Sequence, residues 1–320
     1  MKLYRIAFLC VSLVMISCEK EIHVTIPDRA PRIVINATLV PYTLPSGKYL
    51  GVNVSSSKHI FDSTTNTQLS NAIVLLYKNN LFVDTLHCKS MDNPGFYPLG
   101  FNPMAGPETG ETYKLVVSTD GFETVNAKTT IPPKIEILDV SIDRIAFFDE
   151  NNLVFSKITL TFNDSDSINY YEVVASEIGQ EYNDDNYFRL TTFEPFIIGE
   201  SHYPPALRFD LKKPKHLLFN DKSFDGKKAK VDFYFQAAQR QGSQNILLSD
   251  IISVQLRNVS EEYYKYRSSL LQSSFNNQED LIYGMGEPMN VYSNVEHGYG
   301  VFAGYNNSIK SLELEEIILK

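Results

Sequence analysis

The sequence predicts a mainly β protein in two parts. An antiparallel β-sandwich of the immunoglobulin-like or transthyretin-like kind is expected over residues 32–131, and a larger β domain with one packed helix over residues 134–320. Apolar and polar residues alternate along most of the chain, which is typical of strands that bury one face. Turn signals separate these runs, and helical spacing is confined to a single segment.

The strands of the first part are marked by this alternation and by two tight turns. Residues 33–39 place four apolar side chains on one face. Asn79-Asn80 and Asp120-Gly121 tolerate the positive φ angles of hairpin turns, and each lies between two alternating runs. Pro132 and Pro133 cannot donate to a sheet ladder, so we expect the first part to end at Ile131.

The second part has longer and more aromatic strands, interrupted by one helix near residues 260–273. Ser260 is a good N-cap, and Glu261 and Glu262 occupy the first turn, where the helix dipole favours anions. Tyr263 and Tyr266 recur at helical spacing. We therefore expect the helix to pack its tyrosines on a sheet.

The N-terminus is predicted to be a lipoprotein signal peptide over residues 1–17. Lys2 and Arg5 precede an apolar run that is about half the length of a membrane-spanning helix. Ser17 then precedes Cys18, as in a lipobox, so Cys18 is the expected lipidation site and residues 18–31 the acylated tether. Each buried methylene contributes about 0.8 kcal/mol, so several acyl chains would anchor the protein durably. The alternative is an ordinary secretory signal with an incidental cysteine.

The net charge argues against a nucleic-acid partner, and the cysteine content argues against a disulfide. The chain of 320 residues has a formal net charge of −9, and its basic residues are scattered, which argues against a nucleic-acid partner. Cys10 belongs to the signal and Cys18 is expected to be acylated, which leaves Cys88 as the remaining thiol. We therefore expect no intramolecular disulfide.

Motifs with catalytic spacing have simpler structural explanations here. Gly298, Gly300 and Gly304 resemble a dinucleotide fingerprint but lie in a β tail, so we expect them to allow a bend or a close approach of the backbone. Ser55 and Lys58 have the spacing of a penicillin-recognising nucleophile, but they continue a strand. No cofactor is predicted, and the chain is expected not to be an enzyme.

Metal sites are weakly indicated. His87 and Cys88 are neighbours on a strand and point to opposite faces, so they cannot easily share an ion. Asn163, Asp164 and Asp166 form an oxygen-rich turn that could hold calcium. The favoured interpretation is a plain Asx turn between strands, which makes these three residues weak calcium candidates.

Several segments of the chain resemble the domain-of-unknown-function 4249 family. The similar segments are residues 18–22, 33–37, 71–75, 110–115 and 129–132 in the N-terminal half, and residues 169–171, 224–227 and 294–302 in the C-terminal half. The resemblance implies an outer-membrane lipoprotein of Bacteroidota, often encoded beside a TonB-dependent receptor. Glu19 and Glu21 resemble the surface-export signal of such organisms. The family has no assigned catalytic residues.

The favoured function is therefore a surface-exposed, non-enzymatic accessory of a TonB-dependent receptor in the uptake of an unidentified nutrient. The alternative is an adhesion or structural lipoprotein of the envelope. A glycan-binding module or a hydrolase is less favoured, and the lack of tryptophan argues against glycan binding in particular. The loops 61–69 and 93–107 are longer than hairpins need and are the expected contact surfaces.

Overall fold

The computed structural model describes residues 30–41, 51–59, 62, 67–88, 94–99, 106–149, 152–177, 187–198, 215–236, 238–241, 244–247, 251–283, 290–314 and 317–318. The predicted signal peptide and Cys18 lie outside these residues, as do most of the predicted tether and much of the loops 61–69 and 93–107. The described part is mainly β, which confirms the predicted fold class.

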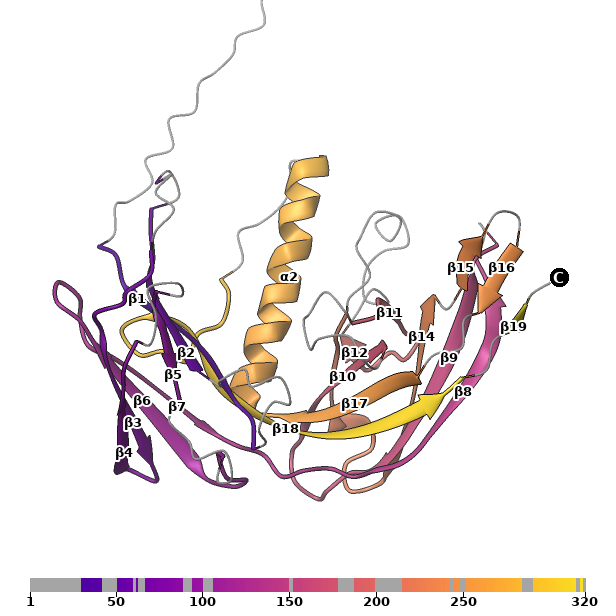
Figure 1. Cartoon of the computed structure of the whole chain (residues 1–320), viewed down its shortest axis with the longest axis horizontal. Helices are drawn as coiled ribbons and strands as arrows, with labels where there is room; N and C mark the ends of the chain where they lie inside the picture. The colour runs from indigo at the N-terminus through magenta and orange to yellow at the C-terminus, as the bar shows by residue number, and fades with distance from the viewer. Residues whose placement is uncertain are drawn as a thin grey trace, which may run out of the picture.

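An eight-stranded sheet forms the centre of the molecule. Its strands, in order across the sheet, are β12 (Ile197–Ile198), β13 (Leu217–Asn220), β10 (Tyr170–Glu177), β17 (Ile251–Val259), β18 (Tyr299–Glu313), β1 (Ile33–Leu39), β2 (Gly51–Ser56) and β5 (Phe96–Pro98). The sheet continues through both halves of the molecule because β18 pairs with β17 on one side and with β1 on the other. In Figure 1 the body is curved, and β17 and β18 run along its concave side.

Three smaller sheets complete the β structure. The first contains β4 (Leu81–Leu86), β3 (Ile73–Lys78), β6 (Thr112–Ser118) and β7 (Val125–Thr130). The second contains β11 (Leu190–Thr191), β14 (Lys228–Gln236), β9 (Val154–Asn163) and β8 (Ile137–Phe148). The third contains β15 (Ala238–Gln241), β16 (Gln244–Leu247) and β19 (Ile317–Ile318).

The two predicted hairpin turns are confirmed. Asn79 and Asn80 join β3 to β4 with φ angles of 50° and 66°. Gly121, with a φ of 80°, lies in the turn between β6 and β7. Left-handed backbone is readily adopted by asparagine and glycine, which explains why these residue types mark the turns.

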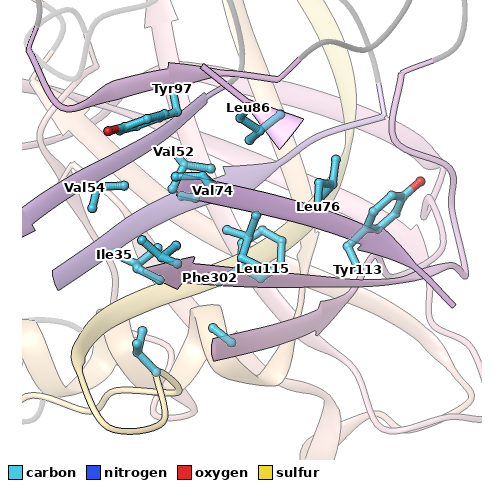
Figure 2. Packing of buried hydrophobic residues seen from close by; sticks show 14 of the residues in the cluster. Ile35, Val52, Val54, Val74, Leu76, Leu86, Tyr97, Tyr113, Leu115 and Phe302 are labelled. Carbon is cyan, nitrogen blue, oxygen red and sulfur yellow. The ribbon is translucent and has the colours of Figure 1, made fainter. Parts of the chain in front are cut away.

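The first hydrophobic core lies between the eight-stranded sheet and the β4-β3-β6-β7 sheet (Figure 2). Ile35 and Val54 face Val74 and Leu115, and all four side chains are fully buried. Their alternation along the strands produces this two-layer packing. Phe302 of β18 joins the same core, so a segment near the C-terminus completes the N-terminal sandwich.

The second core lies between the eight-stranded sheet and the β11-β14-β9-β8 sheet. Its centre is aromatic, and the ring centroids of Phe162 and Tyr171 lie 5.0 Å apart. Phe302 and Leu312 share one face of β18, yet Phe302 packs in the first core and Leu312 against the second. Both four-stranded sheets therefore cover the same face of the eight-stranded sheet.

The chain passes between the two halves three times. The predicted boundary after Ile131 is where the chain leaves the first core, and β8 then begins the second. Val295 and Phe302 return to the first core, and β18 then leads the chain back to the second core at Leu312. The eight-stranded sheet thus joins the two predicted parts into one framework.

The glycines of β18 allow two backbones to approach closely. Gly300 pairs with Ile35 in the parallel β1–β18 ladder and has a φ of 101°. A Cβ atom at this position would lie 2.0 Å from the carbonyl oxygen of Ile35. The predicted role of Gly300 in close approach is confirmed, and a side chain cannot be accommodated there.

The helix α2 (Glu261–Tyr283) stands on the concave face of the eight-stranded sheet (Figure 1). It ends ten residues beyond the predicted segment, because the tyrosine spacing marks only the first turns of the helix. Among the described residues, no helix is long and apolar enough to cross a bilayer.

Candidate functional site

The start of α2 is fixed to the central sheet through its N-cap. The Oγ atom of Ser260 accepts a hydrogen bond from the backbone N–H of Tyr263 at 3.3 Å, as predicted for a cap. The backbone N–H of Ser260 donates to the carbonyl oxygen of Gly304 in β18 at 2.8 Å. The first turn of α2 is therefore held at the centre of the concave face.

Beneath this first turn lies a buried carboxylate, Glu172 of β10, which is 0% exposed. The Nη1 atom of Arg257 in β17 donates to it at 2.6 Å, and the Tyr263 hydroxyl at 2.9 Å. Nδ1 of His216 lies 3.1 Å and Nε of Arg267 3.7 Å from Oε1 of the same carboxylate. We call Glu172, His216, Arg257, Tyr263 and Arg267 the charged cluster.

The charged cluster keeps Glu172 ionised. Burial alone raises the pKa of Glu172, but the nearby positive charges of His216 and Arg257 more than compensate. The pKa of this carboxyl therefore lies well below its usual range. The carboxylate oxygens accept hydrogen bonds from Arg257 and Tyr263, so Glu172 positions these two side chains.

The Arg257 guanidinium is also enclosed. It lies over the Tyr305 ring at 4.9 Å and over the Tyr187 ring at 5.5 Å from the centroids. Its Nη2 atom donates to the Tyr187 hydroxyl at 2.8 Å and to Oε1 of Gln255 at 3.3 Å. These cation–π contacts and hydrogen bonds replace the hydration that Arg257 loses on burial.

Sequence reasoning did not identify the charged cluster. Glu172 and Arg257 are directly opposite in the β10–β17 ladder but lie far apart in the sequence. A signal was present, because polar residues alternate with Ile252, Val254 and Leu256 along β17. This alternation indicates a polar face, but it does not show which strand lies beside it or that α2 covers it.

A groove of about 370 Å³ lies beside the charged cluster, between α2 and the strands β1, β2 and β18. Asn36 and Asn53, a cross-strand pair of β1 and β2, lie on the sheet side. Tyr266 and Arg267 form the helix side. Arg267 belongs both to the groove and to the charged cluster, so the buried carboxylate helps to orient a side chain that lines the groove.

The side chains of the predicted calcium turn do not all lie on the surface. Asn163 and Asp166 are exposed, whereas Asp164 is buried and is joined by Asp221 and Asp225, with the three carboxylates within 4.8 Å of one another. Oδ2 of Asp164 accepts from the backbone N–H of Gly226 at 2.9 Å, and Oδ1 accepts from the Tyr171 hydroxyl. Burial raises the pKa of Asp164, and these two hydrogen bonds partly oppose the shift. Calcium binding here stays a prediction.

A model of the family described as a domain of unknown function, DUF4249, matches residues 19–311. The chain belongs to the DUF4249 family. The match includes the charged cluster, the groove and the three carboxylates, so these features lie within the family domain. None of the curated proteins matches this DUF4249 chain significantly.

The other candidate residues of the DUF4249 chain, Ser55, His87 and Cys88, lie outside the charged cluster and the groove. Ser55 lies in β2 and forms an isolated antiparallel bridge with Gln68. His87 is exposed, whereas Cys88 is half-buried against the first core. Among the described residues, neither belongs to a group of side chains placed to share a metal ion.

Proposed function

We propose that this DUF4249 protein is a lipid-anchored, surface-exposed lipoprotein of the outer membrane. Its role is that of a non-enzymatic accessory of a TonB-dependent receptor in nutrient uptake. Acylation of Cys18 would confine the β body to the membrane, and confinement raises its effective concentration towards a membrane partner. The family match begins at Glu19, directly after this cysteine, which fits an anchored domain.

The observation that carries the proposal is the way α2 is mounted on the concave face. The charged cluster fastens the helix to β10 and β17, because Glu172 contacts Tyr263 and Arg267 of α2 as well as Arg257. Breaking such a buried network is costly, so the first two turns of the helix are held firmly on the sheet. Rigid, preorganised surfaces suit recognition of a partner.

The groove beside α2 also has the chemistry of recognition. Its lining residues are Asn36, Ala37, Thr38, Gly51, Asn53, Tyr263, Tyr266, Arg267 and Val301. Amide, phenol and guanidinium groups provide directional hydrogen bonds and flat contact area.

Affinity purification of the lipoprotein from detergent-solubilised outer membranes tests the proposal. We expect a TonB-dependent receptor to co-purify with the wild type. Asn53→Trp, which fills the groove, should reduce its recovery, because a stable interface buries at least about 1,000 Å² and tolerates misfit poorly. Lys128→Trp is the matched control, since Lys128 is exposed on β7, outside the residues that line the groove.

Two results together would contradict the proposal. One is that no receptor co-purifies with the wild-type lipoprotein. The other is that growth on receptor-dependent nutrients is unchanged when the gene is deleted. The adhesion or structural role would then be favoured. Equal recovery of the receptor with Asn53→Trp and Lys128→Trp would instead show that the receptor contacts a surface other than the groove.

A further inference from the structure

A cluster of aromatic side chains lies on the outward face of the β11-β14-β9-β8 sheet. Along β14, Val231, Phe233 and Phe235 point into the second core, so Tyr234 points outward. The Tyr234 ring lies 5.2 Å from Phe193 and 5.4 Å from Phe147, measured between centroids. We call Phe147, Phe193 and Tyr234 the aromatic platform.

The aromatic platform combines one exposed ring, that of Phe193, with the half-buried rings of Phe147 and Tyr234. Phe193 is 65% exposed, although its ring centroid lies 6.3 Å from that of Phe147. Phe147 in turn stacks on the buried Phe155, with centroids 4.9 Å apart and ring planes 4° from parallel. A single exposed phenylalanine needs no explanation, but Phe193 together with two half-buried rings forms a continuous aromatic surface that suits a contact site.

Polar side chains adjoin the aromatic platform on the same sheet face. Lys157 is directly opposite Tyr234 in the β9–β14 ladder, and Thr159 is opposite Asp232. The Lys157 Nζ atom lies 3.8 Å from Oδ2 of Asp232, and the Thr159 hydroxyl donates to Oδ1 of Asp232 at 2.6 Å. Lys157 and Asp232 are partly exposed, so both can still bond to a ligand.

We propose that this face binds a saccharide, with phenylalanine and tyrosine rings in the stacking role for which the chain has no tryptophan. The C–H face of a sugar ring would pack on the exposed Phe193 ring of the aromatic platform, and neighbouring hydroxyls would bond to Lys157 and Asp232. An apolar protein partner is disfavoured, because it would bury the Lys157–Asp232 pair without replacing its water contacts. Sugar hydroxyls both donate and accept hydrogen bonds, so they can replace the water contacts of Lys157 and Asp232. The proposal does not depend on the receptor partnership, since this face is separate from the groove beside α2.

Affinity electrophoresis of the full mature lipoprotein in detergent tests this proposal. The native gels contain glycogen, xylan, galactomannan or mixed-linkage β-glucan as the probe. We expect at least one of these polysaccharides to retard the wild type. Phe193→Ala should weaken this retardation roughly tenfold, which corresponds to about 1.4 kcal/mol, because it removes the aromatic contact. Phe193→Trp should preserve the retardation because it keeps a flat aromatic ring.

Asp232→Asn is the second variant, and it should also weaken binding because it removes the charged acceptor beside Tyr234. The matched control is Phe82→Ala, because Phe82 is 59% exposed on β4, in a different sheet. The proposal is overturned if none of the four probes retards the wild type. It is equally overturned if Phe82→Ala loses as much retardation as Phe193→Ala. The same variants are also tested for receptor co-purification. A receptor that still co-purifies while no polysaccharide binds overturns the saccharide site alone and leaves the proposed function standing.

Discussion

The Glu172 carboxylate and the Arg257 guanidinium meet at 2.6 Å across neighbouring strands, and both are buried under α2. The same carboxylate accepts a hydrogen bond from Tyr263 and lies 3.7 Å from Nε of Arg267, one helical turn further along α2. One acidic side chain therefore ties the helix to the sheet. The orientation of α2 depends on this cluster as well as on apolar contacts.

Replacing Arg257 with leucine should lower the free energy of unfolding by about 3–5 kcal/mol, because Glu172 would remain buried without its main partner. Urea denaturation of the purified protein measures the change. The exposed Glu261–Lys265 pair, at 3.0 Å, provides the control. Lys265→Ala should cost at most about 0.5 kcal/mol. A similar loss for both variants would show that the charged cluster does not secure α2.

The pH dependence of stability should follow the lowered pKa of Glu172. Its folded pKa lies below the unfolded value of about 4.3, so ionised Glu172 stabilises the fold above that pH. This contribution is lost as the pH falls below about 4. In Glu172→Gln the decline should be shallower, because the titrating group is absent. Urea midpoints from neutral pH down to about pH 3 provide the measurement, and parallel curves for both proteins would contradict the prediction.

Gly300→Ala should disrupt the pairing of β1 with β18. The new Cβ would lie 2.0 Å from the Ile35 carbonyl oxygen, so we expect a loss of at least about 3 kcal/mol. Gly121→Ala separates this clash from backbone strain, because Gly121 also has a positive φ but open space around it. It should cost only about 1 kcal/mol. Thermal unfolding compares the two, and equal losses would rule out close approach as the cause.

Cys18→Ser should release the protein from the outer membrane, because the acyl chains would have no attachment site. Fractionation of cells that express the variant checks this expectation, and protease treatment of intact cells tests whether the wild type faces outward. Cys88→Ser is the matched control, since Cys88 packs half-buried against the first core. Retention of Cys18→Ser in the outer membrane would contradict lipid anchoring, and protease resistance of the wild type would contradict surface exposure.

The sequence by itself determined the mainly β class, the turns at Asn79-Asn80 and Gly121, and the N-cap at Ser260. Each of these depends on neighbouring residues, because alternation, left-handed backbone and helix capping act over a few positions. The role of Gly300 was predictable for the same reason, since glycine within a strand indicates bending or close approach. The acidic turn at Asp164 was identified as well, but not its association with Asp221 and Asp225.

The tertiary structure alone decided which distant strands lie side by side. β18 lies between β1 and β17, which places Phe302 in the first core and brings the two predicted parts into one sheet. The same arrangement places Glu172 beside Arg257 and beneath α2. Alternation shows which residues of a strand share a face. It does not show which strand lies beside it, because every strand offers the same backbone hydrogen bonds. Long-range packing selects the neighbouring strand, and this selection forms the charged cluster and the groove.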